Sequence, residues 1–173
     1  MDDPLHDEAP ELIPRPPQQE DVVSLCRELN RLGAKYVVVG GFAVIEAGYS
    51  RTTGDIDLLV DPAADNEVKV FEALATLPDG AVRELDAGDV EKFTVVRVAD
   101  EVLVDLMAKA SGISYEEAKG HVHVRELDGV KIPFANRDLL WRMKSRSMRP
   151  KDQGDLYFLR ELFAAEGRQP PAS

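Results

Sequence analysis

The stretch that decides the fold runs over residues 36–61 and reads YVVVGGFAVIEAGYSRTTGDIDLLVD. Its first four residues are apolar and predict a strand, which ends in the glycine pair Gly40-Gly41. The residues after the glycines have the spacing of a short helix, and a turn rich in hydroxyl side chains follows. The stretch closes with a second apolar strand, which carries Asp55 and Asp57.

The two aspartates of the second strand point to the same face, because strand side chains alternate, and they lie roughly 6.5 Å apart along it. Two carboxylates aimed at one point repel each other and lose hydration, which is costly unless a cation or a proton lies between them. Mg²⁺ takes one or two carboxylates together with substrate phosphates, and Mn²⁺ is the alternative ion. Glycines let a backbone approach a phosphate closely, and a helix N-terminus favours negative charge. The stretch therefore predicts a metal-nucleotide site.

A third aspartate, Asp105, interrupts an otherwise apolar run over residues 102–107. A charge in the middle of such a strand is costly unless it is paired or bound to a metal. A buried aspartate held in a local salt bridge is one interpretation. Because Asp55 and Asp57 lie upstream, we expect Asp105 to be the third carboxylate of a metal site.

The composition is that of a soluble, single-domain protein. Of the 173 residues, 44% are hydrophobic and 31% are charged, which is ordinary for a globular chain. No run of 18 or more apolar residues predicts a membrane span, so we expect a cytoplasmic protein without a membrane partner. The single cysteine, Cys26, excludes an internal disulfide and a cysteine-based zinc site.

The net charge of −11 argues against a large nonspecific footprint on nucleic acid. The charge is unevenly spread, however, because residues 137–151 hold six basic residues and one acidic residue. The rest of the chain holds 15 basic and 31 acidic residues. A basic segment on an acidic body suits a compact polyanion, such as a triphosphate or an RNA end, better than a long duplex.

The chain divides into one domain and two tails. Residues 1–19 are acidic and proline-rich and predict a disordered tail, and residues 167–173 predict a second one. Between them, residues 20–166 form the domain, with a C-terminal helical segment over 136–166. Expected helices cover 20–32, 42–47, 66–77, 114–120, 136–147 and 151–165, and expected strands cover 36–39, 55–60, 93–98, 102–107, 121–127 and 130–134. In the third helix we expect Asn66 to be the cap and Val68 to point inward. We expect Ser114, with Glu117 three residues later, to cap the helix over 114–120, and Asn136 to cap the helix over 136–147.

The glycine pair, the short helix, an Arg-x-Thr-x-Asp-x-Asp run and a later lone aspartate resemble the polymerase-β-type nucleotidyltransferase superfamily. The resemblance covers residues 36–162 and is greatest to small bacterial stand-alone transferases, including AbiEii-type toxins. It implies an α/β (α+β) fold, a mixed and mostly antiparallel sheet flanked by helices, with C-terminal helices. It also implies that Asp57 is shared by two metal ions, that Asp55 is a second ligand, and that Asp105 binds the catalytic ion and helps to deprotonate the acceptor hydroxyl.

Gly40 and Gly41 resemble the phosphate-contacting pair of this superfamily. Many of its members have Gly-Ser there, and the serine hydroxyl touches the leaving pyrophosphate, whereas this chain has a second glycine. Ser50, Arg51 and Thr52, followed by Thr53, could supply donors from the turn. A plain connecting loop is the alternative interpretation.

The segment RMKSRSMRPKDQGDL resembles a Lys…Lys-Asp-x-x-Asp run of the toxin-like branch, in which a lysine contacts the triphosphate and an aspartate orients it. The matching residues here are Lys144, Lys151, Asp152 and Asp155. They can act together only if the two helices that carry them pack against each other. A solvated basic face is the alternative.

We therefore expect a metal-dependent nucleotidyltransferase that uses an NTP such as ATP. The acceptor hydroxyl can belong to an RNA 3′ end, above all that of a tRNA, to a small molecule such as an antibiotic, or to a partner protein. The toxin-like resemblance also implies an antitoxin partner, with a homodimer as the alternative. A degenerate binding module without catalysis is the competing class.

Overall fold

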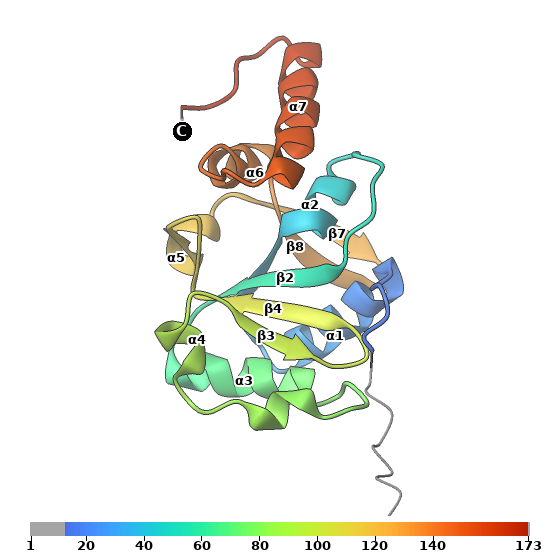
Figure 1. Ribbon diagram of the computed structural model, residues 1–173, viewed down its shortest axis with the longest axis vertical. Coiled ribbons are helices and arrows are strands. Elements are labelled where there is room, and N and C mark those ends of the chain that lie inside the picture. The colour runs from blue at the N-terminus through green and yellow to red at the C-terminus, as the bar shows by residue number, and fades with distance from the viewer. Residues whose placement is uncertain (1–12, 173) are drawn as a thin grey trace, which may run out of the picture.

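The computed structural model describes residues 13–172, which form a mixed six-stranded sheet with helices on both faces (Figure 1). The strand order is β3-β4-β2-β1-β8-β7. The strands are β1 Tyr36–Val39, β2 Asp55–Val60, β3 Val96–Ala99, β4 Leu103–Met107, β7 Val122–Leu127 and β8 Val130–Ala135. Three neighbouring pairs are antiparallel (β1–β2, β3–β4 and β7–β8) and two are parallel (β2–β4 and β1–β8). The expected fold class, with its mixed and mostly antiparallel sheet, is confirmed.

The helices pack in two groups around this sheet. Helix α1 (Gln19–Arg31) contacts β8 and α3 (Ala64–Leu74), whereas α2 (Gly40–Glu46) contacts β1, β2 and α6 (Arg137–Lys144). Helix α7 (Pro150–Ala165) follows α6 and packs on it, above the sheet in the view of Figure 1. Both expected C-terminal helices are therefore present, although α6 ends three residues earlier than the pattern predicts.

Register places the site residues on adjacent strands. Asp57 of β2 is the parallel partner of Asp105 of β4, and Arg97 of β3 is the antiparallel partner of Asp105. The neighbours of the aspartates, Ile56 and Val104, point to the opposite face and are fully buried. Because the side-chain period is two, burying these apolar residues turns the aspartates to the face below α6.

The third helix begins at Ala64, two residues earlier than expected, and this overturns two predictions. Asn66 is inside the helix, where its side chain bonds the backbone of Lys35 and Asp61, so it is not the cap. Val68 is 55% exposed and does not point inward. The stripe that packs on the body is instead formed by Asn66, Val70, Ala73 and Leu74.

Several short elements carried no periodic signal long enough to predict them. They are η1 (Ala81–Glu84), α4 (Asp89–Lys92), β5 (Lys109–Ala110) and β6 (Ile113–Ser114). Helix α5 (Tyr115–Ala118) is shorter than expected, but Ser114 caps it as the Ser-x-x-Glu spacing predicts. The strand expected over 93–98 begins only at Val96, which leaves residues 93–95 as an exposed connection.

Part of each expected tail lies against the body. Residues 1–12 are outside the described part of the chain. The backbone N–H of Arg15 donates to the carbonyl of Glu101, and its side chain pairs with Asp21 and Glu101. At the other end, Arg168 pairs with Asp138 at 2.7 Å. Among the described helices, none has both the length and the apolar character needed to cross a bilayer.

Replacing Asn66 with Ala is expected to destabilise the protein by about 2–3 kcal/mol, because it removes three part-buried hydrogen bonds to the backbone of Lys35 and Asp61. Urea unfolding followed by circular dichroism measures this free energy. Asp65→Ala, an exposed change in the same helical turn, is the control and should cost less than about 0.5 kcal/mol. Equal losses in the two variants would contradict the assigned role of Asn66.

Candidate functional site

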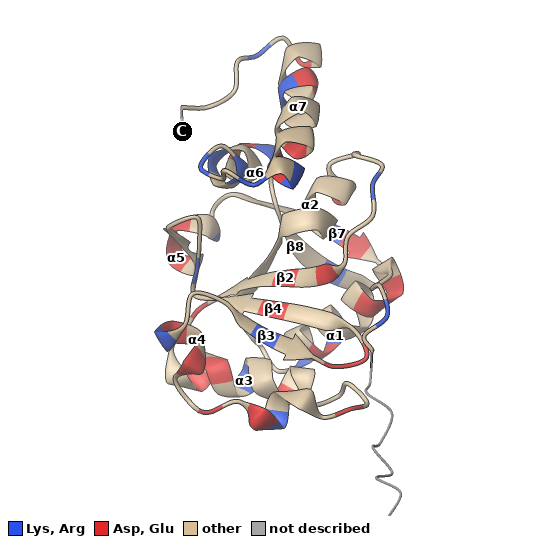
Figure 2. Ribbon diagram, viewed as in Figure 1, with Lys and Arg blue, Asp and Glu red and all other residues tan. Residues whose placement is uncertain are grey.

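Three carboxylates converge on the sheet face below α6. Asp55 and Asp57 come from β2 and Asp105 from β4, and one oxygen of each lies within 4.8 Å of the others. Figure 2 shows their acidic bands side by side on the two strands. Oxygen atoms at this spacing suit Mg²⁺ or Mn²⁺, so the described residues fit the divalent ion that the sequence predicts. We term Asp55, Asp57 and Asp105 the triad.

Arg97 pairs with two members of the triad. Its Nε and Nη2 donate to the two carboxylate oxygens of Asp105, each at 2.8 Å, and Nη2 also donates to Asp55 at 3.0 Å. Arg97 is not among the residues predicted from the sequence, where its one signal is a basic side chain between two valines, Val96 and Val98, that the structure buries. The guanidinium compensates part of the repulsion among the carboxylates, and the salt bridge considered for Asp105 does exist.

Within residues 13–172, no cationic side chain pairs directly with Asp57. Burial and, after it, the charges of Asp55 and Asp105 together raise its pKa to about 7, although the more distant Lys144 and Lys151 offset part of the rise. The carboxylate that the resemblance assigns to both metal ions is therefore the one with the strongest need for a further positive charge.

The two glycines are required by close contacts. Gly40 has φ +66°, and a Cβ there would lie 2.0 Å from an oxygen of Asp57. A Cβ on Gly41 would lie 2.5 Å from Oγ1 and 2.6 Å from Cβ of Thr53. The departure from Gly-Ser thus has a physical reason, because Thr53 fills the space that a side chain at position 41 would need. The hydroxyl of Thr53 donates to the backbone carbonyl of Asp55 at 3.2 Å.

Helices α6 and α7 pack together and join the cationic residues to buried carboxylates. Lys144 Nζ lies 2.7 Å from Asp152 Oδ1 and 3.0 Å from Asp155 Oδ2. Asp155 also pairs with Arg51, at 2.8 Å from Nε and 3.0 Å from Nη2. Both aspartates are fully buried, so the structure brings together four of the predicted residues from distant parts of the chain.

Asp152 is held ionised by its neighbours. Burial alone would raise its pKa, but hydrogen bonds from Lys144, Ser147 and Arg149 outweigh burial and lower the pKa to about 2. A permanently charged carboxylate in this position fixes the direction of Lys144 and Arg149.

A cleft of about 610 Å³ connects the triad with four basic residues of the turn before β2 and of α6 and α7. We term these residues the cationic wall: Arg51, Lys144, Arg149 and Lys151. The predicted residues that line the cleft are Gly40, Gly41, Arg51, Thr52, Asp55, Asp57, Asp105, Lys144, Lys151 and Asp152. Two predicted residues do not line it: Ser50 is exposed outside the cleft, and Asp155 is buried behind Lys144 and Arg51. Lining residues missed at first include Thr94, Arg97, Lys109 and Arg149. In Figure 2 the blue of basic residues covers much of α6 and the beginning of α7.

Comparison with known proteins gives a family and a fold. A family model described as "Nucleotidyl transferase of unknown function (DUF2204)" matches residues 18–168. The lincomycin-bound lincosamide antibiotic adenylyltransferase LnuA is similar over 86% of this chain and 99% of that chain, with a TM-score of 0.53 and 12% identity. An antigenic nucleotidyltransferase-like protein from Paracoccidioides brasiliensis is similar over 86% and 79%, with a TM-score of 0.53 and 20% identity. No match was found among curated proteins.

The raised pKa of Asp57 predicts that the free energy of unfolding depends on pH. In the native state Asp57 keeps its proton up to about pH 7, whereas the unfolded chain releases it near its ordinary value, so metal-free stability falls as the pH rises through this range. Asp57→Asn abolishes this titration. Between pH 5 and pH 8 in EDTA, the variant should therefore gain about 2 kcal/mol in unfolding free energy relative to the unmodified protein. An equal difference at both pH values in urea unfolding would contradict the raised pKa.

Arg97 is expected to compete with divalent ions for the triad. Arg97→Gln should bind Mn²⁺ about tenfold more tightly, because a positive charge in contact with two ligands is removed. The same variant should melt at a lower temperature in EDTA and gain more from Mn²⁺ than the unmodified protein does. Isothermal titration calorimetry and thermal melts measure both effects.

Arg125→Gln is the matched control, since Arg125 is similarly half-exposed and pairs with Glu46 away from the triad. It should leave Mn²⁺ affinity unchanged. Weaker Mn²⁺ binding by Arg97→Gln would show that Arg97 supports the metal ligands instead of competing with ions.

Proposed function

The chain belongs to the nucleotidyl transferase family whose model spans residues 18–168, and from this premise we propose a metal-dependent reaction at the triad. A nucleoside monophosphate passes from an NTP, for which ATP is the first candidate, to an acceptor hydroxyl. The observation that carries the proposal is the convergence of Asp55, Asp57 and Asp105 at one end of a cleft whose other end is cationic.

The triad residues would hold Mg²⁺ or Mn²⁺, which supplies charge neutralisation of the phosphates and polarisation of the reacting oxygens. Asp57, which pairs with no cation in the described part of the chain, is the proposed shared ligand, and Asp55 is the second. Arg97 fixes both oxygens of Asp105, so this carboxylate keeps one orientation toward the acceptor hydroxyl.

The triphosphate is proposed to lie along the cationic wall. Lys144 and Arg51 are fixed there by Asp155, and Lys151 and Arg149 add exposed positive charge. Backbone N–H groups at Gly40-Gly41 open helix α2 beside Asp57, where an anion is favoured. Catalysis in this arrangement rests on positioning and charge stabilisation.

Two classes of acceptor each have an observation in their favour. An RNA 3′ end, such as that of a tRNA, suits the basic segment on α6 and α7 and the resemblance to toxin-like transferases. With this acceptor we also propose a cytoplasmic location and either an antitoxin partner or a homodimer. A small-molecule acceptor suits the acidic body, and the structural neighbour LnuA is a lincosamide antibiotic adenylyltransferase. Modification of a protein hydroxyl and a non-catalytic binding module are alternatives that the same experiment separates.

Label transfer from each α-³²P NTP with Mg²⁺ tests the proposal. Total RNA, a protein extract and lincomycin are offered separately as acceptors. Asp57→Ala should lower transfer about 100-fold or more, because it removes the proposed shared metal ligand. Asp65→Ala, which removes an exposed carboxylate on α3, should leave the rate unchanged.

The destination of the label identifies the acceptor class. Label in tRNA would support an RNA acceptor, as in toxin-like transferases. Label in lincomycin would support a small-molecule acceptor, and label in protein would support modification of a partner protein. Metal-dependent NTP binding without transfer to any of the three would favour the non-catalytic module, and absence of NTP binding would overturn the proposed function.

A further inference from the structure

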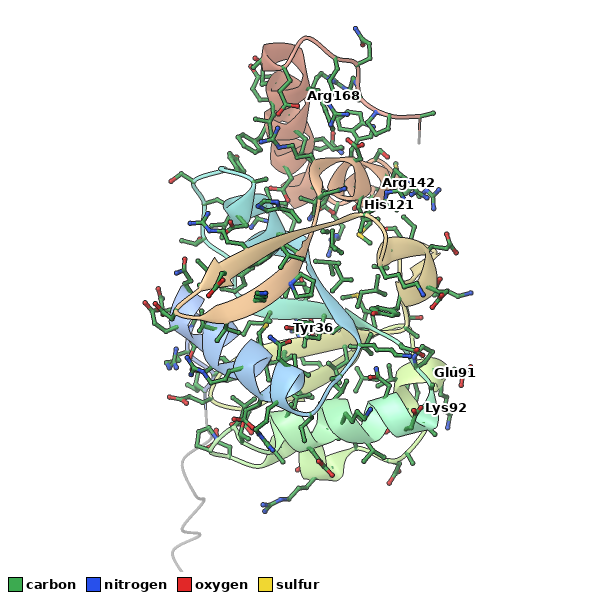
Figure 3. The ribbon with its side chains drawn as sticks, turned by 180° about the vertical axis from the view of Figure 1, so that it is seen from behind. Tyr36, Glu91, Lys92, His121, Arg142 and Arg168 are labelled. Carbon is green, nitrogen blue, oxygen red and sulfur yellow. The ribbon has the colours of Figure 1, made fainter. Side chains whose placement is uncertain are left out.

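A second hollow adjoins the triad cleft at the end of the sheet where β2 and β4 finish. It has a volume of about 690 Å³ and is bounded by Asp61, Glu91, Phe93, Lys109 and Tyr115. We term it the side chamber. Its walls come from the end of β2, the α4–β3 connection and the β5–β6–α5 segment, on the side of the molecule where Figure 3 labels Glu91 and Lys92.

The side chamber and the triad cleft share walls. Thr94, Lys109 and Ser111 line both hollows, so a molecule can extend from one into the other. From Asp105 to Lys109 the chain advances four residues and bends at Ala108, so the two residues lie at most about 13 Å apart. A molecule of two or three rings bridges this distance, and a volume of several hundred cubic ångströms is usual for a small-molecule site.

The two hollows differ in charge. The triad cleft has six basic and four acidic residues in its walls, a basic excess that suits a triphosphate with its metal ions. The side chamber has three carboxylates, from Asp61, Glu91 and Glu116, and two ammonium groups, from Lys92 and Lys109. An acidic excess repels phosphate, so the side chamber disfavours a second polyanion.

The side chamber also offers an aromatic surface. Phe93 is 50% exposed, and the ammonium group of Lys92 lies 5.2 Å from the centre of its ring. Tyr115, Pro62 and Ala108 add further apolar wall. A half-exposed ring that already attracts one cation provides a face for a flat ring or for a ligand ammonium group.

We infer that the side chamber is the acceptor site of the proposed transferase and takes a neutral or cationic small molecule with a ring and a hydroxyl group. This inference rests on the proposed function. The ring lies on Phe93, and the hydroxyl reaches the triad past Thr94. Transfer forms a bond between the hydroxyl oxygen and the α-phosphorus and breaks the bond from that phosphorus to the oxygen that leads to the β-phosphorus. Pyrophosphate leaves, and the hydroxyl proton passes to Asp105 or to water.

Three phenols of nearly equal size test the chemical class. Tyramine is cationic, tyrosol is neutral and 4-hydroxyphenylacetate is anionic at pH 7.5. Each is titrated into the full chain saturated with Mg²⁺ and α,β-methylene-ATP, a nucleotide that does not transfer, and backbone NMR shifts are recorded. We expect shifts at residues 91–95, 109 and 115, with tyramine and tyrosol binding at least about threefold more tightly than the anion.

Phe93→Ala should weaken tyramine and tyrosol at least about threefold and leave the affinity for α,β-methylene-ATP unchanged. Because Phe93 is half-exposed, this variant keeps the core intact. Tyr157→Ala is the matched control, since it removes an exposed aromatic ring of α7 that lines neither hollow, and it should bind all three phenols as before.

Each other outcome has a defined meaning. Tightest binding of the anion, or equal binding of all three phenols, would overturn the assigned chemical class. Shifts that avoid the side chamber, or that persist in Phe93→Ala, would overturn the site while the proposed function stands on its nucleotide binding. Failure of the unmodified chain to bind α,β-methylene-ATP would overturn the proposed function and this inference with it.

Discussion

The rest of the structure depends on confining three carboxylates to one small region of a sheet face. Oxygen atoms of the triad lie within 4.8 Å of one another, and like charges this close destabilise the fold unless positive charge is brought to them. Arg97 on the adjacent strand supplies part of that charge directly. Lys144 and Lys151 supply more from a distance. The remaining imbalance resides on Asp57, which gives the site its capacity for a divalent ion.

Most of the basic side chains of the cleft are separate from the acidic triad. Arg51, Lys144 and Arg149 are anchored by two fully buried carboxylates, Asp152 and Asp155, so this part of the cleft keeps its shape without drawing on the triad for partners. Burying Asp152 and Asp155 is tolerated because each accepts at least two charged contacts. The molecule thus separates a negative point, which suits metal ions, from a positive wall, which suits phosphates.

Local patterns predicted the residues that depend on the period of one strand or one helix. Asp55 and Asp57 follow from alternation, Asp105 from a charge within an apolar run, and the caps Ser114 and Asn136 from their spacing. What these patterns could not supply was register between distant segments. Arg97 joins the triad because β3 pairs with β4 at that residue, and no spacing within residues 93–98 reveals it.

Contacts that fold back across the chain were equally hidden. Thr53 matters because it fills the space beside Gly41, and Asn66 matters because it reaches the backbone of Lys35. The side chamber is built from elements of two to four residues, which are too short for any period to predict. The resemblance did place Lys144 with Asp152 and Asp155, since it supplied a spatial relation that the sequence alone lacked.

The double pairing of Asp155 has a consequence for the order of assembly during synthesis. This one carboxylate joins Arg51, from the first third of the chain, to Lys144, near its end. Strand β1 likewise acquires its second neighbour only when β8 has been made. A ribosome-bound chain that stops before α7 therefore has the three aspartates of the triad but lacks Asp155, the shared partner of Arg51 and Lys144. The cationic side of the cleft thus takes its final form only when the last helix has been made.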